Sequence, residues 1–255
     1  IKNILLSIRE NRPKPFFDDK TQIDLNAYWI STLIFVSEVF DKENWKKIAL
    51  KNYNIIKDLT KDEIYHCYKE KEGVKVFLDD YAYLSQLMIN FYETTGEIVY
   101  LNDAKEITQK TWDLFYDKSN KILQKNLIEK NDLFVAPSDI NDSNIPNGNS
   151  IFLLNCKKLE AISGEEKWQN MTKELKQSFH SFLNLQSTQM VSYIKNLDMC
   201  EELQTFTFFG DFKKNVELHQ YVKKNYLRSS TLIYKKDSKE NYLIVCKNQT
   251  CSNKI

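Results

Sequence analysis

The chain has 255 residues, with 36 Lys and Arg against 35 Asp and Glu, so its formal net charge is only +1. A hydrophobic content of 42% excludes a disordered chain, and the even charge balance, without a basic stripe, argues against a nucleic-acid partner. The longest apolar stretch is far short of the roughly 20 residues that span a membrane, so we expect no membrane partner either.

A repeated pattern organises the first two thirds of the chain. Each copy has a short polar opening, an apolar helix, a tight turn and a second, more amphipathic helix. The openings are Phe17-Asp18-Asp19, Leu78-Asp79-Asp80 and Gly148-Asn149-Ser150. The expected turns lie at residues 41–44, 94–97 and 163–166, and the last two contain Gly96 and Gly164, the residue type that best ends a helix.

These repeats predict antiparallel helix hairpins that must stack on one another to bury their apolar faces. The first helix of each pair is apolar on more than one face, which is typical of a buried helix. Inner and outer rings of helices follow, so we expect a partial α/α toroid that leaves some apolar inner surface exposed. Between the second and third hairpins lies a long connection, residues 117–147, of the kind that often carries function.

The pattern changes near residue 204. Residues 205–209, 230–235 and 242–246 are rich in aromatic and β-branched side chains and predict strands, and residues 216–226 predict a helix. A strand, a helix and a strand in this order suggest a parallel pair. The fold class is therefore mainly α, with a toroid portion over residues 1–203 and a small α/β segment over residues 204–255.

Five motifs occur in order along the chain: NRPKPFFDDK from Asn11, FLDDYAYL from Phe77, FYETTGEIVYL from Phe91, DSNIPNGNS from Asp142 and VCKNQTC from Val245. Together they resemble the C-terminal region of thioredoxin domain-containing proteins of the spermatogenesis-associated protein 20 type. The sequence departs from the usual family pattern around Asn26, where Leu25 and Ala27 replace Trp and Gly, and at Asn147, which replaces a Ser.

The resemblance implies an N-terminal thioredoxin-like domain and first hairpins that this sequence does not contain, followed by a six-hairpin α/α toroid. Such toroids are similar to those of certain glycosidases and N-acylglucosamine 2-epimerases, so a carbohydrate-active enzyme is one expectation. The epimerases use histidine bases, and none of His66, His180 and His219 lies in a matching motif. An epimerase mechanism is therefore not expected here.

The acid pairs are the candidate catalytic residues: Asp18, Asp19, Asp79 and Asp80. Two carboxylates that share a pocket have separated pKa values and provide an acid and a base near neutral pH. The alternative is helix capping, because Asp is a good N-cap residue and suits the positive end of a helix. The residues alone favour helix capping over a catalytic site. When the resemblance is included, the two interpretations are equally favoured.

The candidate substrate-binding residues are Arg12, Lys20, Asn26, Tyr81, Asp142, Asn149 and Ser150. We expect the acid pairs and Asn149 to gather at one rim, because all inner helices of a hairpin array run the same way. Arg12 or Lys20 would supply the counter-charge. Surface charge, capping and core packing are the alternatives for these residues. We expect neither a resident metal nor a cofactor.

Five cysteines at wide spacing argue against a disulfide scaffold. Cys246 and Cys251 are compatible with a redox pair, half a metal site or a disulfide, but inert thiols are favoured. Free thiols indicate a reducing, cytoplasmic compartment, although a chain that begins at Ile1 rather than Met leaves the natural N-terminus outside the sequence.

Two functions from different classes fit these features. The first is a toroid that binds, or acts on, a polar small molecule such as a sugar. The second is a non-catalytic platform that holds a substrate or partner for the thioredoxin-like domain. Convergence of the motifs around a concave pocket would favour the first.

Overall fold

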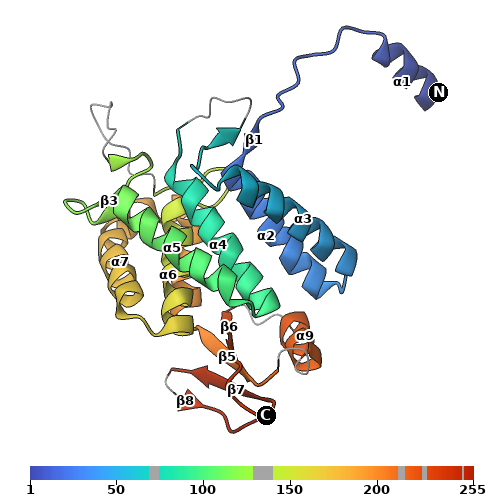
Figure 1. Ribbon diagram of the computed structural model, residues 1–255. Coiled ribbons are helices and arrows are strands. Elements are labelled where there is room, and N and C mark those ends of the chain that lie inside the picture. The colour runs from blue at the N-terminus through green and yellow to red at the C-terminus, as the bar shows by residue number, and fades with distance from the viewer. Residues whose placement is uncertain (69–74, 129–139, 212–215, 226–228, 249) are drawn as a thin grey trace.

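The computed structural model describes residues 1–68, 75–128, 140–211, 216–225, 229–248 and 250–255. Three helix hairpins follow one another along the chain (Figure 1). They are α2 (Ile23–Val39) with α3 (Glu43–Leu59), α4 (Leu78–Thr95) with α5 (Ile98–Phe115), and α6 (Gly148–Ser163) with α7 (Glu166–Gln186). A short 3-10 turn (Ser187–Gln189) then leads into α8 (Val191–Glu201), which packs on α6.

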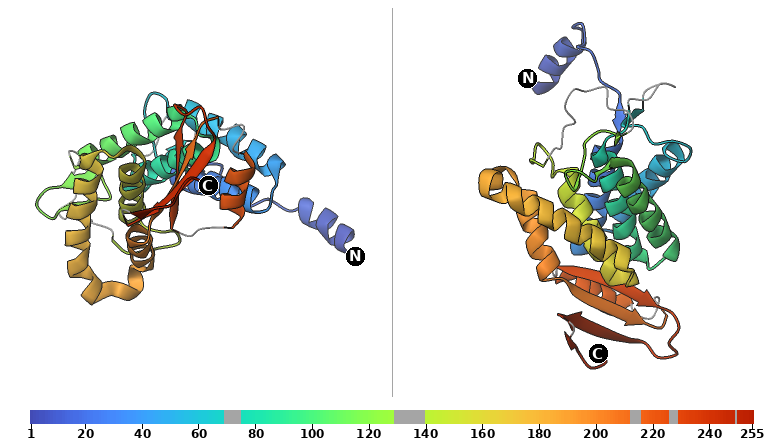
Figure 2. Two further views of the ribbon diagram at one scale, coloured as in Figure 1. Left: turned by 90° about the horizontal axis from the view of Figure 1, so that it is seen from below. Right: turned by 90° about the vertical axis from the view of Figure 1, so that its left-hand side faces the viewer.

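The hairpins form part of an α/α toroid. The inner helix α4 packs against both α2 and α6, and each outer helix packs on its own partner. Seen from below, the helices curve in an arc and the C-terminal strands cross its concave side (Figure 2, left). The inner helices are apolar on several faces because neighbours cover them from more than one direction. Their buried side chains form one continuous core, so the mainly helical prediction is confirmed.

Glycine ends two of the inner helices as the sequence predicts. Gly96 follows α4 with φ +67°, and Gly164 follows α6 with φ +70°. Each donates its backbone N–H to the carbonyl four residues earlier, at 2.8 Å. A left-handed residue at this place satisfies the last carbonyls of the helix, and glycine adopts it without a Cβ clash.

The opening of the first hairpin differs from the sequence prediction. We placed the apolar helix from about Asn26 to Phe40 and treated Asp18-Asp19 as its capping opening by analogy with Asp79-Asp80, whereas α2 begins at Ile23. Asp18 and Asp19 are exposed, on an extended segment before β1 (Thr21–Gln22). They are therefore not in the first turn of a helix, and the capping interpretation is wrong for this pair. The segment carries the chain into β1, which pairs antiparallel with β2 (Cys67–Tyr68).

A second two-stranded ladder, β3 (Tyr116–Asp117) with β4 (Ile122–Leu123), begins the long connection between the second and third hairpins. Both residues of β4 are buried, at 1% and 0% exposure. Part of the connection, residues 129–139, lies outside the described residues. The ladder places β4 against the first turn of α6, where the side chain of Asn149 hydrogen-bonds the backbone of Leu123.

The C-terminal segment is a four-stranded sheet of order β6-β5-β7-β8 with one helix. Its elements are β5 (Gln204–Phe209), α9 (Val216–Lys224), β6 (Ser230–Lys235), β7 (Tyr242–Lys247) and β8 (Thr250–Cys251). Strands β5 and β6 are parallel, whereas β7 runs antiparallel to β5. The predicted strands, helix and parallel pair are confirmed. The edge strand β8 was not predicted, because two residues give no alternating pattern.

Glu93, on the last turn of α4, joins the hairpins to this sheet. Its carboxylate accepts hydrogen bonds from Lys158 Nζ at 2.8 and 3.0 Å and from Thr231 Oγ1 at 2.6 Å. Burial alone would raise the pKa of Glu93, but the ammonium groups of Lys158 and Lys223 and these hydrogen bonds hold it below its ordinary value. Its backbone carbonyl accepts from Tyr234 Oη at 2.5 Å and lies 3.1 Å from His219 Nε2.

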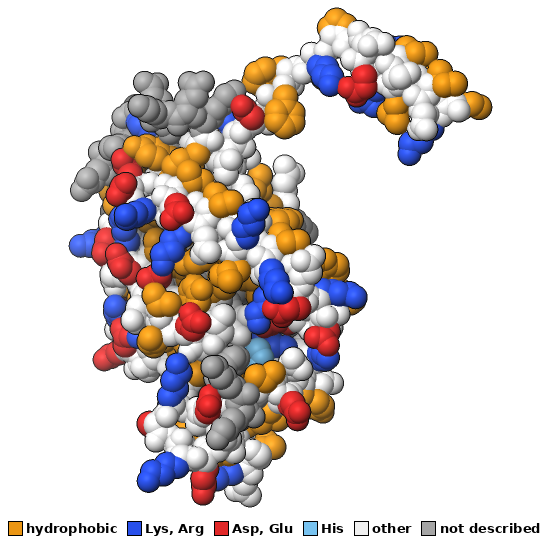
Figure 3. Space-filling model, turned by 45° about the vertical axis from the view of Figure 1, so that its right-hand side comes forward, with side chains coloured by type: hydrophobic (Ala, Val, Ile, Leu, Met, Phe, Trp, Pro, Cys, Tyr) orange, Lys and Arg blue, Asp and Glu red, His pale blue; other side chains and the backbone are white. Residues whose placement is uncertain are grey.

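Helix α1 (Lys2–Glu10) stands away from the rest of the molecule, and Figure 3 shows its hydrophobic side chains in solvent. The open side of α2 is also apolar, with Leu25, Tyr28, Trp29 and Phe35 all more than a third exposed. The predicted exposure of inner-helix surface is thus confirmed. Among the described residues, no helix is both long enough and apolar enough to cross a lipid bilayer.

Candidate functional site: an acidic rim and a concave cavity

The inner helices present equivalent polar residues at their N-termini. Asp24, Asp79 and Asn149 are each the second residue of their helix, in α2, α4 and α6. Because the helices start side by side, these positions gather at one rim. Asp24 donates its backbone N–H to Asp80 Oδ1 at 3.2 Å, and Gly148 donates its own to the carboxylate of Asp79. The rim therefore exists, with Asp24 in the place that we had assigned to Asp18 and Asp19.

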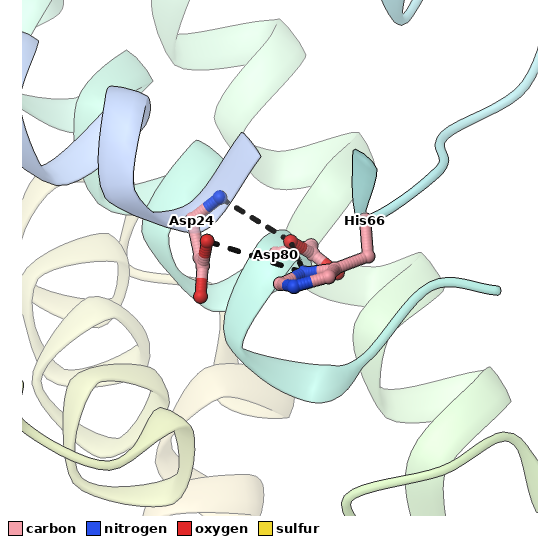
Figure 4. A group of neighbouring side chains, drawn as sticks. All are labelled: Asp24, His66 and Asp80. Carbon is pink, nitrogen blue, oxygen red and sulfur yellow. Dashed lines mark hydrogen bonds and ion pairs between the residues drawn. The ribbon is translucent and has the colours of Figure 1, made fainter. Parts of the chain in front are cut away.

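Asp80 is the buried centre of the rim, with 0% exposure. Its Oδ2 accepts the backbone N–H of Phe77 at 2.8 Å, which caps α4, and its Oδ1 accepts from Asp24 N and from His66 Nδ1. Figure 4 shows Asp24 and His66 on either side of Asp80. Both carboxylate oxygens are thus hydrogen-bonded, which offsets the cost of burying the group.

His66 lies 3.0 Å from Asp80 Oδ1 through its Nδ1 atom. A carboxylate only accepts hydrogen bonds, so Nδ1 carries a proton and Nε2, which lies 3.3 Å from the amide nitrogen of Gln22, is the basic nitrogen. The hydrogen bond to Asp80 raises the pKa of His66 against the opposing effect of burial. The Nε2 lone pair faces the Gln22 amide, so His66 could act as a base only once that contact is released.

Asp24, His66 and Asp80 are also close enough to be considered as metal ligands, since one donor atom from each lies within 4.8 Å of the others. The hydrogen-bond pattern does not favour an ion. The protonated Nδ1 of His66 cannot coordinate a metal, and Asp80 Oδ1 already accepts two hydrogen bonds. We therefore interpret the group as a hydrogen-bonded network.

Asp79 is a rim acid whose pKa is raised well above its ordinary value. Burial raises its pKa to about 6, and the charges of Asp24 and Asp80 add to the effect. Lys125 and the Gly148 N–H act in the opposite direction. The Asp79 carboxylate lies directly against the start of α6. A Cβ on Gly148 would lie only 2.6 Å from Asp79 Oδ1, so a side chain does not fit there. Glycine at this position lets the two helix ends approach.

The other predicted binding residues at the N-terminal side have local roles. Arg12, Lys20 and Asp18 are exposed, and Lys20 Nζ pairs with Asp18 Oδ2 at 3.2 Å. Asn26 donates from its amide to the carbonyl of Gln22 at 2.7 Å, within its own helix. Tyr81 is 3% exposed and packs edge-on against Phe115. The counter-charge that acts on Asp79 comes from Lys125, which the sequence argument did not identify.

The remaining predicted residues join α6 to its neighbours. Asn149 holds β4 through both functional atoms of its amide, accepting from Leu123 N at 3.1 Å and donating to Leu123 O at 2.9 Å. Asp142 accepts the backbone N–H of Ser192 at 2.7 Å and thereby caps α8. Ser150 and Ser192 share a hydrogen bond of 2.6 Å between their hydroxyls. These three predicted residues are thus satisfied by protein partners.

A cavity of about 440 Å³ lies on the concave side of the inner helices. Helices α2, α4, α6 and α8 form its walls, and residues of α9 and β6 close one end. Its lining includes Tyr28, which stands one turn after Asp24 in α2 and whose ring lies 5.2 Å from that of Tyr83, whereas Asp24, His66, Asp79 and Asp80 do not line it. The Tyr83 hydroxyl donates to the carbonyl of Pro146, another lining residue, at 2.7 Å.

The cavity lining combines apolar side chains with hydrogen-bonding groups. The polar side chains include Gln86, Asn90, Asn155 and Asn196. Ser31 Oγ, Thr94 Oγ1 and Glu38 Oε1 also belong to lining residues, and all three atoms are buried with no hydrogen-bond partner in the described structure. Ser31 is 5% and Thr94 1% exposed. A smaller cavity of about 200 Å³ shares Glu38, Thr94 and Lys223 with the larger one.

Unsatisfied buried polar atoms are costly and uncommon in native proteins. Three of them belong to lining residues, but each atom is closed to solvent as the side chains stand, so a molecule in the cavity would reach them only after a small rotation of these side chains. The charges around the space are mixed. Lys158 pairs with Glu93, and Lys223 pairs with Glu38 at 3.1 Å. The geometry therefore favours a polar molecule with several hydrogen-bonding groups over a strongly charged one.

Comparison with known proteins gives one weak structural likeness. No model of a known protein family matches the sequence, and no curated protein matches it. Among solved structures the chain is similar to the cellobiose 2-epimerase from Bacillus thermoamylovorans B4167, with 14% sequence identity and a TM-score of 0.49. The matched region covers 62% of this chain and 44% of the epimerase chain, so this chain spans less than half of that protein. Agreement this low carries no argument about function.

Asp24 and His66 are the site residues that the sequence argument missed. Asp24 could have been found from the helix register, because it is the second residue of α2 as Asp79 is of α4. We instead aligned Asp18-Asp19 with Asp79-Asp80 because both are Asp-Asp pairs. That alignment is wrong by six residues, since Asp24 is the equivalent of Asp79. His66 reaches the rim through the β1–β2 ladder, a pairing of two-residue strands that leaves no periodic signal in the sequence.

Proposed function

We propose that this chain binds a small, polar, carbohydrate-like molecule in the concave cavity. The observation that supports the proposal best is the set of three unpartnered polar atoms, in Ser31, Glu38 and Thr94, that belong to its lining residues. A volume of about 440 Å³ lies within the range of small-molecule sites. A sugar offers hydroxyl donors and acceptors on its edge and apolar C–H groups on its faces, which matches the mixed lining.

The orientation of the ligand follows from the chemistry of the groups. Glu38 Oε1 only accepts hydrogen bonds, so it requires a hydroxyl or an amino donor. Tyr28 lies at the rim end and offers an aromatic ring for the apolar face of a sugar. We propose that one end of the ligand lies near the rim, where Asp79 and His66 stand as acid and base candidates. Of the four acids first considered, we retain Asp79 in this role, with Asp80 as the residue that positions His66.

We also propose, on the sequence resemblance alone, that the chain is part of a cytoplasmic thioredoxin domain-containing protein. In that setting the toroid would act beside a thioredoxin-like domain of the same polypeptide. The division into a toroid portion over residues 1–203 and an α/β segment over residues 204–255 belongs to the same proposal. The platform alternative does not require a ligand in the cavity, so ligand binding separates the two functions.

The test is a thermal-shift screen of the chain against neutral, amino and acidic mono- and disaccharides. We expect neutral or amino sugars to raise the melting temperature, because these supply the donors that Glu38 lacks. Saturation at 100 times the dissociation constant corresponds to about 2.7 kcal/mol of stabilisation. A panel that leaves the melting temperature unchanged, with an intact fold by circular dichroism, would favour the platform function.

A further inference from the structure

The two cysteines of the last hairpin are bonded to each other. Cys246 in β7 and Cys251 in β8 occupy directly opposite positions in the antiparallel ladder and form a disulfide. The sequence argument favoured inert thiols here, and that interpretation is wrong, because the antiparallel register of β7 and β8 places the two residues opposite each other. Among the described residues, neither Cys246 nor Cys251 belongs to the two hydrophobic clusters.

We propose that the Cys246–Cys251 disulfide is a site of reversible thiol–disulfide exchange with a dithiol. The inference is independent of ligand binding in the cavity. It rests first on access: Cys251 is exposed and Cys246 is half-buried, at the edge of the sheet. The other three cysteines, Cys67, Cys156 and Cys200, are buried, free, and have pKa values raised chiefly by burial. Thiolate character and exposure govern exchange, so the chemistry is confined to one pair.

Opening this disulfide does not require the protein to unfold. The chain beyond β8 stays attached to β7 through backbone hydrogen bonds, from Ser252 N to Val245 O at 2.8 Å and in both directions between Leu243 and Ile255 at 3.0 Å. The disulfide closes a loop of only six residues, and short loops restrict the unfolded chain least. Its reduction therefore destabilises the fold less than opening a longer loop would, and the exposure of Cys251 leaves the bond accessible in the native state.

The exchange balances as two successive displacements. A thiolate of the dithiol attacks Cys251 Sγ, the more exposed sulfur, and forms a mixed disulfide, while Cys246 leaves as a thiolate and takes up a proton. The second thiol of the dithiol then attacks the dithiol's first sulfur, which is bonded to Cys251 Sγ in the mixed disulfide. This step releases the Cys251 thiolate, which takes up a proton. The dithiol is oxidised to a disulfide, and the protein gains two electrons and two protons.

Dithiothreitol is a suitable probe. The folded chain is treated with it, quenched with an alkylating reagent and analysed by peptide mass spectrometry. We expect Cys246 and Cys251 to be alkylated together in native buffer and to re-form the disulfide with oxidised glutathione, while the three buried cysteines react only in denaturant. Reduction of the pair only in denaturant would overturn the proposal, and so would a pair that stays reduced in oxidised glutathione.

Two single variants test which sulfur is attacked. Cys246→Ser leaves Cys251 as the lone surface thiol, and Cys251→Ser leaves Cys246. With oxidised glutathione we expect the mixed disulfide to form at least about tenfold faster on Cys251, because exposure controls the rate. Equal rates would overturn the assignment of Cys251 as the attacked sulfur, and unchanged circular dichroism and melting curves would show that both variants are folded.

Discussion

At the residue scale, Asp79 is held at an energetic cost. Its pKa in the folded protein is about 6, above the ordinary value near 3.8. A carboxyl group whose folded pKa is raised destabilises the fold as the pH rises through the window between the two values. A difference of about two pKa units corresponds to about 3 kcal/mol above pH 6. Natural proteins retain such a cost where a group has a functional role.

Asp79→Asn should therefore stabilise the protein at pH 7 by about 1 to 3 kcal/mol, and by almost nothing at pH 4. The amide oxygen of Asn still accepts the Gly148 N–H, so the contact with α6 survives. Chemical denaturation of both proteins at the two pH values measures the effect. An equal change at pH 4 and pH 7 would show that the charge of Asp79 is not the cause.

The residue scale also marks the limit of the sequence argument. Asp79 and Asp80 were correctly placed in the first turn of an inner helix, because an apolar 3.6-residue period follows them immediately. Asp18 and Asp19 were not, since the two-residue strand β1 intervenes before α2. The roles of Asn149 and Asp142 as partners of β4 and α8 depend on contacts between distant segments, which periodicity does not encode.

At the element scale, the hairpin tips were predicted well. The glycines that end α4 and α6 share one conformation but differ in surroundings. A Cβ on Gly96 would lie 3.1 Å from the ring of Tyr234 in β6, whereas a Cβ on Gly164 would meet nothing within 4 Å. The tip of the second hairpin therefore packs on the C-terminal sheet at Gly96, whereas the position of Gly164 in the third hairpin has open space around it.

Gly164→Ala should cost about 1 to 2 kcal/mol, the strain of a left-handed alanine. Gly96→Ala should cost at least about 1 kcal/mol more, since the added methyl also crowds Tyr234. The free energy of unfolding of the two variants, measured side by side, isolates that contact. Equal costs would indicate that the sheet is not packed against the tip of the second hairpin.

Glu93 is a second link between helix α4 and strand β6 of the C-terminal sheet. Glu93→Gln removes the charge that pairs with Lys158, a side chain only 14% exposed, and the structure predicts a loss of about 3 to 5 kcal/mol. Glu97→Gln, at an exposed position beyond the same helix, is the control and should be nearly neutral. We expect limited proteolysis of Glu93→Gln to cut first in the C-terminal segment. A melting curve like that of the control would remove Glu93 from this role.

At the scale of the whole molecule, the hairpin arc and the C-terminal sheet enclose the cavity together. The sequence predicted both parts from periodicity and composition. It did not predict that β6 and α9 would close one end of the concave face, because that arrangement depends on the buried contacts of Glu93. The cavity, rather than the acid pairs alone, is therefore the feature that the structure adds to the functional argument.

The central claim is that unpartnered groups of the cavity lining bind a ligand, and Thr94→Val tests it most directly. Valine keeps the shape of Thr94 and removes its unpartnered hydroxyl. The account predicts that the stability of the variant is unchanged or slightly higher. It also predicts that the affinity for the best sugar from the screen, measured by calorimetry, falls about tenfold, near 1.4 kcal/mol. Thr172→Val on the outer helix α7 is the matched control and should leave the affinity unchanged. Equal sugar affinity for Thr94→Val and the unmodified chain would contradict the account.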